Sequence, residues 1–188
     1  ICLLVKRTMK SITLHDKTFV PFISNQEIES AIDKVAEKLN EKHINDEQPP
    51  ILLCILNGAL MFTSELMKRL DFVTELVTVK LASYEGTQSS GKIREDMGLT
   101  GDVRGRNVII CEDIVDTGKT IVYLKNLLKE KGAAKVEVCT MLLKPDIYKQ
   151  DVVLDYVAME IPLRFIVGFG LDYDQIGRGT KDIYVLEE

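Results

Sequence analysis

Acidic residues and a glycine-bearing turn stand directly after an apolar run in the middle of the chain. Residues 107–111 are β-branched and nearly uncharged, which predicts a strand buried on both faces of a parallel sheet. Glu112 and Asp113 follow, then Asp116 and the sequence Thr-Gly-Lys-Thr at 117–120. Because carboxylates accept hydrogen bonds from sugar hydroxyls and such turns bind anions, this segment is expected to hold a phosphorylated sugar.

The turn at 117–120 gains its affinity for anions from the helix that it begins. Residues 121–131 place their apolar side chains on one helical face before Gly132 ends the helix. A helix N-terminus presents unpaired N–H groups and the positive end of the helix dipole, both of which favour phosphate. Gly118 allows close approach of the backbone, and Thr117 and Thr120 add hydroxyl donors.

Glu112 and Asp113 need a partner other than phosphate, such as the vicinal hydroxyls of a ribose or a divalent cation. Neighbouring residues on a strand point to opposite faces, so only one of them faces the ligand unless the strand has begun to turn. The alternative is that both acids merely cap the following helix.

Two other classes of phosphate or acidic site fit the pattern less well. A Walker A loop needs a glycine five positions before Gly118, where this chain has Asp113. A phosphoacceptor receiver domain would carry its acceptor Asp and an acidic pair on different strands, whereas here all the acids share one segment.

The rest of the chain alternates strand and helix patterns. Ser24 and Glu27 form a capping box at the start of a helix expected over 24–42. Strands are expected at 51–56, 74–81, 136–143 and 164–171, a helix at 59–70, and a loop or irregular hairpin at 83–100. This order predicts an α/β fold with a parallel sheet, whose ligands bind beyond the carboxyl ends of the strands.

Residues 108–120 resemble the phosphoribosyl pyrophosphate signature of the type I phosphoribosyltransferases. The Glu-Asp pair and Lys119 before Thr120 are most similar to the 6-oxopurine branch, and the resemblance runs from about Met9 to the C-terminus. It implies a central, mostly parallel twisted sheet flanked by helices, with a small hood built from the N- and C-terminal segments. The implied reaction is purine salvage: transfer of the 5-phosphoribosyl group to hypoxanthine or guanine, giving IMP or GMP and pyrophosphate.

The resemblance also assigns residues to the phosphoribosyl pyrophosphate site. Glu112, Asp113 and the segment 116–120, including Lys119, would bind the phosphoribosyl group. Leu56, Asn57 and Gly58 match a pyrophosphate loop that often holds a non-proline cis peptide, and Arg178 matches a pyrophosphate-binding arginine. The alternative for 56–58 is a simple strand-to-helix turn.

Base recognition is implied at a second set of residues. Lys144 would donate to the exocyclic oxygen of the purine, Phe165 would stack on the base, and the carbonyl of Ile166 would accept from it; by itself, Phe165 fits a core residue as well. Asp116 would act as the general base. Asp172, Glu112 and Asp113 are the expected Mg²⁺ ligands.

Ser83 and Tyr84 match the start of a mobile lid, for which an ordinary solvated loop is the alternative. Excluding water would matter because a trapped water would compete with the purine as nucleophile.

Composition limits the remaining possibilities. The chain has 188 residues, 46% hydrophobic content and a net charge of −5, which fits one domain over 9–188 and gives no sign of a nucleic-acid surface. No apolar stretch reaches membrane-spanning length, and we interpret 1–8 as a leader before a natural start at Met9. We expect a cytoplasmic homodimer or homotetramer with no nucleic-acid or membrane partner.

Single residues complete this picture. Cys54, Cys111 and Cys139 lie in apolar strand-like runs and are expected to be reduced core thiols, while His15 and His43 receive no role. The alternatives for function are a same-fold transferase for xanthine or another base, and a nucleotide-binding regulator of the same fold.

Overall fold

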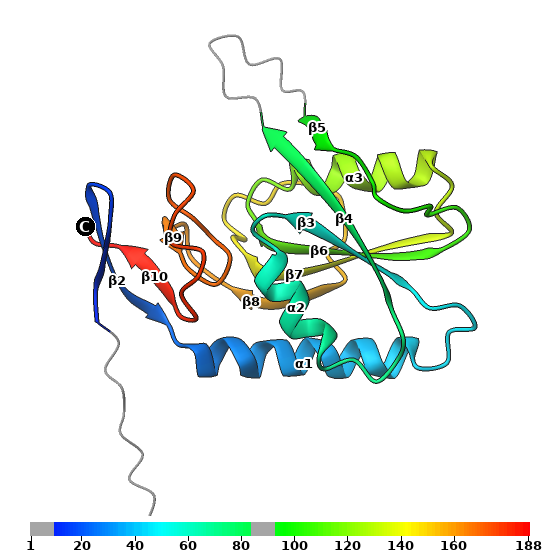
Figure 1. Ribbon diagram of the computed structural model, residues 1–188, viewed down its shortest axis with the longest axis horizontal. Coiled ribbons are helices and arrows are strands. Elements are labelled where there is room, and N and C mark those ends of the chain that lie inside the picture. The colour runs from blue at the N-terminus through cyan, green and yellow to red at the C-terminus, as the bar shows by residue number, and fades with distance from the viewer. Residues whose placement is uncertain (1–9, 84–92) are drawn as a thin grey trace, which may run out of the picture.

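A six-stranded sheet forms the larger part of the protein in the computed structural model, which describes residues 10–83 and 93–188 (Figure 1). The strand order is β5-β4-β3-β6-β7-β8; β5 is antiparallel to β4, and the other five strands are parallel. The bounds are β3 Ile51–Leu56, β4 Glu75–Ser83, β5 Ile93–Met97, β6 Asn107–Val115, β7 Lys135–Leu143 and β8 Tyr156–Glu160. The leader at 1–8 and Tyr84 lie outside the described residues.

Helices cover both faces of this sheet: α1 (Asn25–His43) and α2 (Leu60–Met67) on one side, α3 (Lys119–Glu130) on the other (Figure 1). Alternate residues of β6 therefore enter different cores, with Ile109 packed in the cluster of α1 and α2 and Ile110 in the cluster of α3. The predicted α/β class with a mostly parallel sheet is confirmed.

The predicted start of α1 is confirmed in detail. The backbone N–H of Glu27 donates to Ser24 Oγ at 3.3 Å, and the backbone N–H of Ser24 donates to Glu27 Oε2 at 2.8 Å. This reciprocal capping box satisfies backbone donors that the first turn of a helix leaves unpaired. The helix α2 is shorter than the predicted 59–70.

A second, antiparallel sheet is built from both ends of the chain, as the resemblance implied for a hood. Its order is β1-β2-β10-β9, with bounds β1 Ile12–Leu14, β2 Lys17–Ile23, β9 Ile166–Val167 and β10 Ile183–Leu186. Figure 1 shows it beside the main sheet, and Ile23 and Ile183 join the same core cluster as α1. We call this sheet the hood.

Two strand predictions need correction. The expected strand at 164–171 is limited to β9, in the hood, because residues 168–170 take φ angles of 103°, 48° and 103° and turn the chain away. The strand expected at 107–111 continues as β6 through both acids to Val115, because its ladder with β7 extends to the pair Val115 and Leu143. Strand β8 was not predicted.

Three cysteines form a row across the middle of the main sheet. Cys54 of β3 is in register with Cys111 of β6, which is in register with Cys139 of β7. All three are free and buried, as predicted. Burial raises the pKa of each thiol, so none has the thiolate character of a reactive cysteine.

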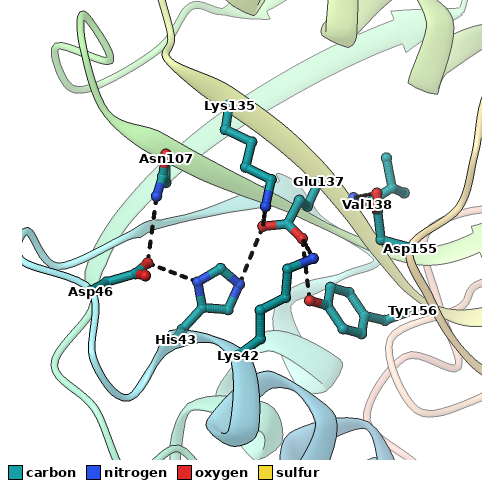
Figure 2. Close-up of polar contacts among 9 residues, drawn as sticks. All are labelled: Lys42, His43, Asp46, Asn107, Lys135, Glu137, Val138, Asp155 and Tyr156. Atoms are coloured by element: carbon teal, nitrogen blue, oxygen red, sulfur yellow. Dashed lines mark hydrogen bonds and ion pairs between the residues drawn. The ribbon is translucent and has the colours of Figure 1, made fainter.

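Buried charged side chains gather near the amino end of β7 (Figure 2). Glu137 is 1% exposed and His43 is 2% exposed. We call this group the Glu137 cluster; it comprises Lys42, His43, Asp46, Lys135, Glu137 and Tyr156.

The imidazole of His43 lies between two carboxylates of this cluster. Its Nδ1 is 2.8 Å from Asp46 Oδ2, and its Nε2 is 3.2 Å from Glu137 Oε2. Burial alone would raise the pKa of Glu137, but a hydrogen bond from Lys42 and the charges of His43 and Lys135 hold that pKa below its usual value. His43, which the sequence left without a role, therefore joins the end of α1 to β7.

Candidate active site

The turn at 116–120, which we call the phosphate turn, leads directly into α3. Gly118 is the N-cap with φ 77°, and no side chain caps the helix. Val122 N donates to Gly118 O at 3.1 Å as the first helical bond, so the N–H groups of residues 119–121 have no helical partner. The interpretation of Glu112 and Asp113 as helix caps is wrong, and the backbone donors needed to bind an anion are present.

The acid pair stands where β6 has already separated from β3. The β3–β6 ladder ends at Cys54 and Cys111, while β6 continues beside β7. Glu112 is 7% exposed, and burial followed by the charge of Asp113 raises its pKa well above the usual value. Burial also raises the pKa of Asp113. Two carboxyl groups this close favour sharing a proton, accepting hydroxyl donors or binding a cation.

Close backbone approaches connect the acid pair to the loop after β3. The Leu56–Asn57 peptide is cis, the isomer often seen in the matching family loop. A Cβ on Gly58 would lie 1.7 Å from Asp113 Oδ2, and a Cβ on Gly170 would lie 2.0 Å from Gly58 O. A side chain at Gly170 would meet the backbone of Gly58, and a side chain at Gly58 would displace the Asp113 carboxylate. The carboxylate, the loop after β3 and the segment after β9 are therefore in direct contact.

Arg178 completes this connection from the hood. Its Nη1 donates to Gly170 O at 2.7 Å, and its Nη2 lies 2.7 Å from Asp172 Oδ1. The positive charge of Arg178 also opposes the rise in the pKa of Asp113. The structure thus brings together Asp113 of β6, Gly58 of the loop after β3, and Asp172 and Arg178 of the segment between β9 and β10.

Lys144 and Asp116 meet at the ends of neighbouring strands. Lys144 Nζ lies 3.0 Å from Asp116 Oδ1, and the backbone N–H of Lys144 donates to Val115 O at 3.0 Å. Lys144 is 8% exposed, whereas the Asp116 side chain is 48% exposed. A buried ammonium donor and an accessible carboxylate therefore stand next to the phosphate turn.

The other two residues expected to bind the base, Phe165 and Ile166, lie at β9 of the hood. Phe165 is 46% exposed, and its ring meets that of Tyr173 edge-on at 5.7 Å, so the alternative that it is a core residue is wrong. Leu186 N donates to Phe165 O at 2.9 Å, which makes these two a hydrogen-bonded pair of the antiparallel ladder. The next residue, Ile166, therefore directs its backbone groups away from β10, toward the open edge of the hood.

The expected metal ligands do not form a protein-only cluster. Among the described residues, no group of three or more His, Cys, Asp or Glu side chains could hold a metal ion. Asp172 is engaged by Arg178 and by the backbone N–H of Gln175 at 2.8 Å. Of the expected lid residues, Ser83 is the last residue of β4.

Three residues at this edge were missed by sequence reasoning: Tyr148, Gln150 and Gly170. Tyr148 and Gln150 both contact the phosphate turn. They belong to a polar segment without periodicity, so no sequence signal marks these contacts. The two glycines in the sequence Gly-Phe-Gly at 168–170 were a usable signal, because glycine inside a predicted strand marks a bend or a close approach.

Comparison with known proteins agrees with this geometry. The model of the phosphoribosyl transferase domain matches residues 23–174. The chain therefore belongs to the phosphoribosyltransferase family. Its relatives include the hypoxanthine-guanine phosphoribosyltransferase of Streptococcus pneumoniae, which is 38% identical over 167 residues covering 88% of this chain and 92% of that protein.

Solved structures of the same kind superpose on the chain. The hypoxanthine phosphoribosyltransferase of Staphylococcus aureus gives a TM-score of 0.82 at 30% identity, covering 89% of this chain and 90% of that one. The Trypanosoma cruzi enzyme in complex with its product IMP gives 0.83 at 29% identity, covering 94% and 97%. Within the residues that the structure describes, no helix is both long enough and apolar enough to cross a membrane.

Proposed function

We propose that the protein transfers the 5-phosphoribosyl group from phosphoribosyl pyrophosphate to hypoxanthine or guanine, giving IMP or GMP and pyrophosphate. The observation that carries this proposal is the 3.0 Å contact between Lys144 and Asp116 beside the phosphate turn. It brings an ammonium donor and a carboxylate together beside the N-terminus of α3, which supports a purine-binding donor, a general base and a phosphate site at adjacent strand ends. The named relatives carry out chemistry of this class.

The phosphate turn binds the 5-phosphate, and the acid pair accepts hydrogen bonds from the ribose hydroxyls. Both sites lie away from the reacting atoms, so their binding energy orients the anomeric carbon toward the purine nitrogen. Because Glu112 is buried, water competes little with the ribose hydroxyls for its carboxyl group.

Asp116 takes or polarises the proton of the purine ring nitrogen as the new bond forms. Lys144 donates to the exocyclic oxygen of a 6-oxopurine. Adenine presents an amino group at that position, so the buried ammonium would face another donor, and adenine is rejected. Phe165 offers an exposed ring for stacking, and Ile166 offers its backbone groups at the open edge of β9.

Mg²⁺ is the expected cofactor, and the residues present fit it. Mg²⁺ commonly binds one or two carboxylates together with substrate phosphates rather than a complete protein cage. Asp172 beside Arg178, with the acid pair at Gly58, supplies this partial donor set. When bound with pyrophosphate, the ion neutralises charge on the leaving group, and Arg178 adds a second positive charge.

We further propose a cytoplasmic homodimer or homotetramer. Three buried, unpaired thiols suit a reducing compartment. Exposed apolar side chains such as Val73 and Leu76 offer contact area for a second copy. Size-exclusion chromatography with light scattering measures the number of subunits. A single domain over 9–188 remains a prediction.

The deciding experiment supplies hypoxanthine, guanine, xanthine and adenine separately with phosphoribosyl pyrophosphate and Mg²⁺, and measures nucleoside monophosphate by chromatography. We expect product with hypoxanthine or guanine and none with adenine. Product with xanthine alone would favour the same-fold transferase for another base. Tight binding of nucleotide without product from any base would favour the regulator.

A further inference from the structure

The segment that connects β7 to β8 lies across the phosphate turn. Gln150 Nε2 donates to Thr117 O at 3.0 Å. A Cβ on Gly118 would lie 2.4 Å from Tyr148 Cε2 and 2.8 Å from Gln150 Cγ. Two side chains of this segment therefore hold the two residues that precede α3, and Gly118 is buried beneath them.

The same segment begins at the lysine that faces Asp116. Lys144 O accepts from the backbone N–H of Tyr148 at 3.3 Å, so the chain turns back immediately after Lys144. The hydroxyl of Tyr148 donates to Val152 O, which closes the segment on itself. The segment is thus fixed at two points: at Lys144 by the ion pair with Asp116, and at Gln150 by the hydrogen bond to Thr117.

We propose that Tyr148 and Gln150 are positioning residues, which hold the backbone of the phosphate turn in its phosphate-binding conformation and link that turn to Lys144. This inference rests on the proposed function and identifies which residues order its phosphate site. Neither side chain needs to touch the reacting atoms.

The physical reason lies in the conformation of Gly118. Its φ of 77° directs the chain into α3, and a glycine in an exposed turn would sample many other conformations. A phosphate is bound most tightly when the N–H donors already point at it. The ring of Tyr148 and the amide of Gln150 restrict the turn, so the donors need little further ordering when the ligand binds.

Two ligands that differ only in the phosphate provide the test. IMP and inosine share base and ribose, so titration calorimetry of both isolates recognition of the phosphate. We expect Tyr148→Ala and Gln150→Ala each to weaken IMP about tenfold, equivalent to about 1.4 kcal/mol, and inosine less than about twofold. The matched control Lys149→Ala, at the exposed position between them, should change neither.

Steady-state kinetics should show the same division. KM for phosphoribosyl pyrophosphate should rise in Tyr148→Ala and Gln150→Ala, while kcat and KM for hypoxanthine change much less. Equal losses for IMP and inosine would reduce both residues to general structural roles and overturn the proposal. Unchanged IMP affinity would overturn it too.

A ligand-free measurement separates this inference from the proposed function. In a double-mutant cycle, Gly118→Ala should lower the Tm less in the Tyr148→Ala background than in the parent, because the overlap with the ring is gone while the overlap with Gln150 Cγ and the backbone strain remain. Additive effects would show that the ring does not hold the turn. If the parent protein bound no IMP yet showed coupling in this cycle, the proposed function would be refuted. The inference that Tyr148 holds the turn would stand.

Discussion

Individual side chains at the carboxyl edge of the main sheet carry features that serve ligand binding at the expense of stability. The clearest is Glu112, a carboxyl group enclosed next to a second carboxyl group at the end of β6. In the absence of a ligand, nothing in its surroundings compensates its charge as fully as water would. The group is therefore expected to destabilise the free protein.

Glu112→Gln should stabilise the free protein while impairing catalysis. The pKa of Glu112 in the folded protein lies above its unfolded value of 4.5, so the folded form must retain a proton that the unfolded form releases as the pH rises. The penalty is about 1.4 kcal/mol for each unit of the pKa difference. The Tm of the variant should exceed that of the parent by a margin that grows from about pH 4 to neutral pH.

Thermal unfolding across this pH range measures the effect, and Glu130→Gln, at an exposed position on α3, serves as control. A constant difference in Tm, independent of pH, would count against the assignment of the penalty to this titration.

Asp116→Asn should lower kcat more than it lowers affinity for phosphoribosyl pyrophosphate. The amide still fits the phosphate turn but cannot accept the purine proton, and general base catalysis typically contributes about 10²- to 10⁴-fold. It also removes the charge that faces Lys144 at 3.0 Å. Steady-state kinetics together with equilibrium binding separates the two effects, and equal losses in both would contradict the role of general base.

At the scale of helices and strands, the Glu137 cluster joins α1 to β7 at the edge opposite the active site. Glu137→Gln removes the negative charge that faces Lys42 and His43. Breaking a buried ion pair typically costs about 3 kcal/mol or more, and because Lys42 is half-exposed we expect a loss of at most about 3 kcal/mol here. Because the folded-state pKa of Glu137 is lowered, its contribution is present above the unfolded value of 4.5 and lost as the pH falls through the folded pKa.

Urea unfolding at neutral pH and at about pH 4 tests this: the difference between Glu137→Gln and the parent should shrink in acid. Glu41→Gln, at an exposed site of α1, should match the parent at both pH values. Purine transfer should be unchanged in both variants, since the cluster lies at the other edge of the sheet.

Elements with a local signal could be predicted from the sequence, and the others could not. The capping box of Ser24 and Glu27 and the strand, acid, glycine and helix order around Gly118 are complete within a few residues. By contrast, β8 is short and takes its place from pairing with β7, and the short length of β9 is set by its pairing with β10, which was not predicted. The clustering of His43 with Glu137 likewise depends on tertiary contact alone.

Across the whole molecule, the active-site residues come from the carboxyl ends of the main sheet and from the segment after β9. Arg178 orders that segment, because it binds both Asp172 and Gly170, the residue that contacts Gly58. Arg178→Lys cannot keep both the bond to Gly170 O and the pair with Asp172, because an ammonium lacks the planar fork of a guanidinium. We expect KM for phosphoribosyl pyrophosphate to rise about tenfold or more, with a smaller change in KM for hypoxanthine.

Arg164→Lys provides the matched control, because Arg164 forms an exposed ion pair with Glu188 on the surface beside β9. If initial-rate measurements gave the same constants for both variants, the interpretation that Arg178 orders the segment after β9 for pyrophosphate binding would be wrong.

The general plan of the molecule followed from the sequence, since parallel strands that each end in polar residues must place those residues at one edge. The contacts that tighten this edge did not. Gly58 against Asp113, Gly170 against Gly58 and Tyr148 against Gly118 all join segments that are remote in the chain. These contacts depend on tertiary packing, so local sequence patterns do not predict them.

The row of Cys54, Cys111 and Cys139 allows the rate at which the main sheet becomes exposed to be measured by thiol labelling. A thiol reagent cannot reach these sulfurs until β3, β6 and β7 lose their helical cover, so labelling should advance in concert at the rate of that opening rather than one site at a time. In a Cys2→Ser variant these three are the remaining cysteines, so mass spectrometry of the labelled protein would measure the rate of core exposure without an engineered cysteine. Repeating the measurement with bound nucleotide would show how much the ligand slows that exposure.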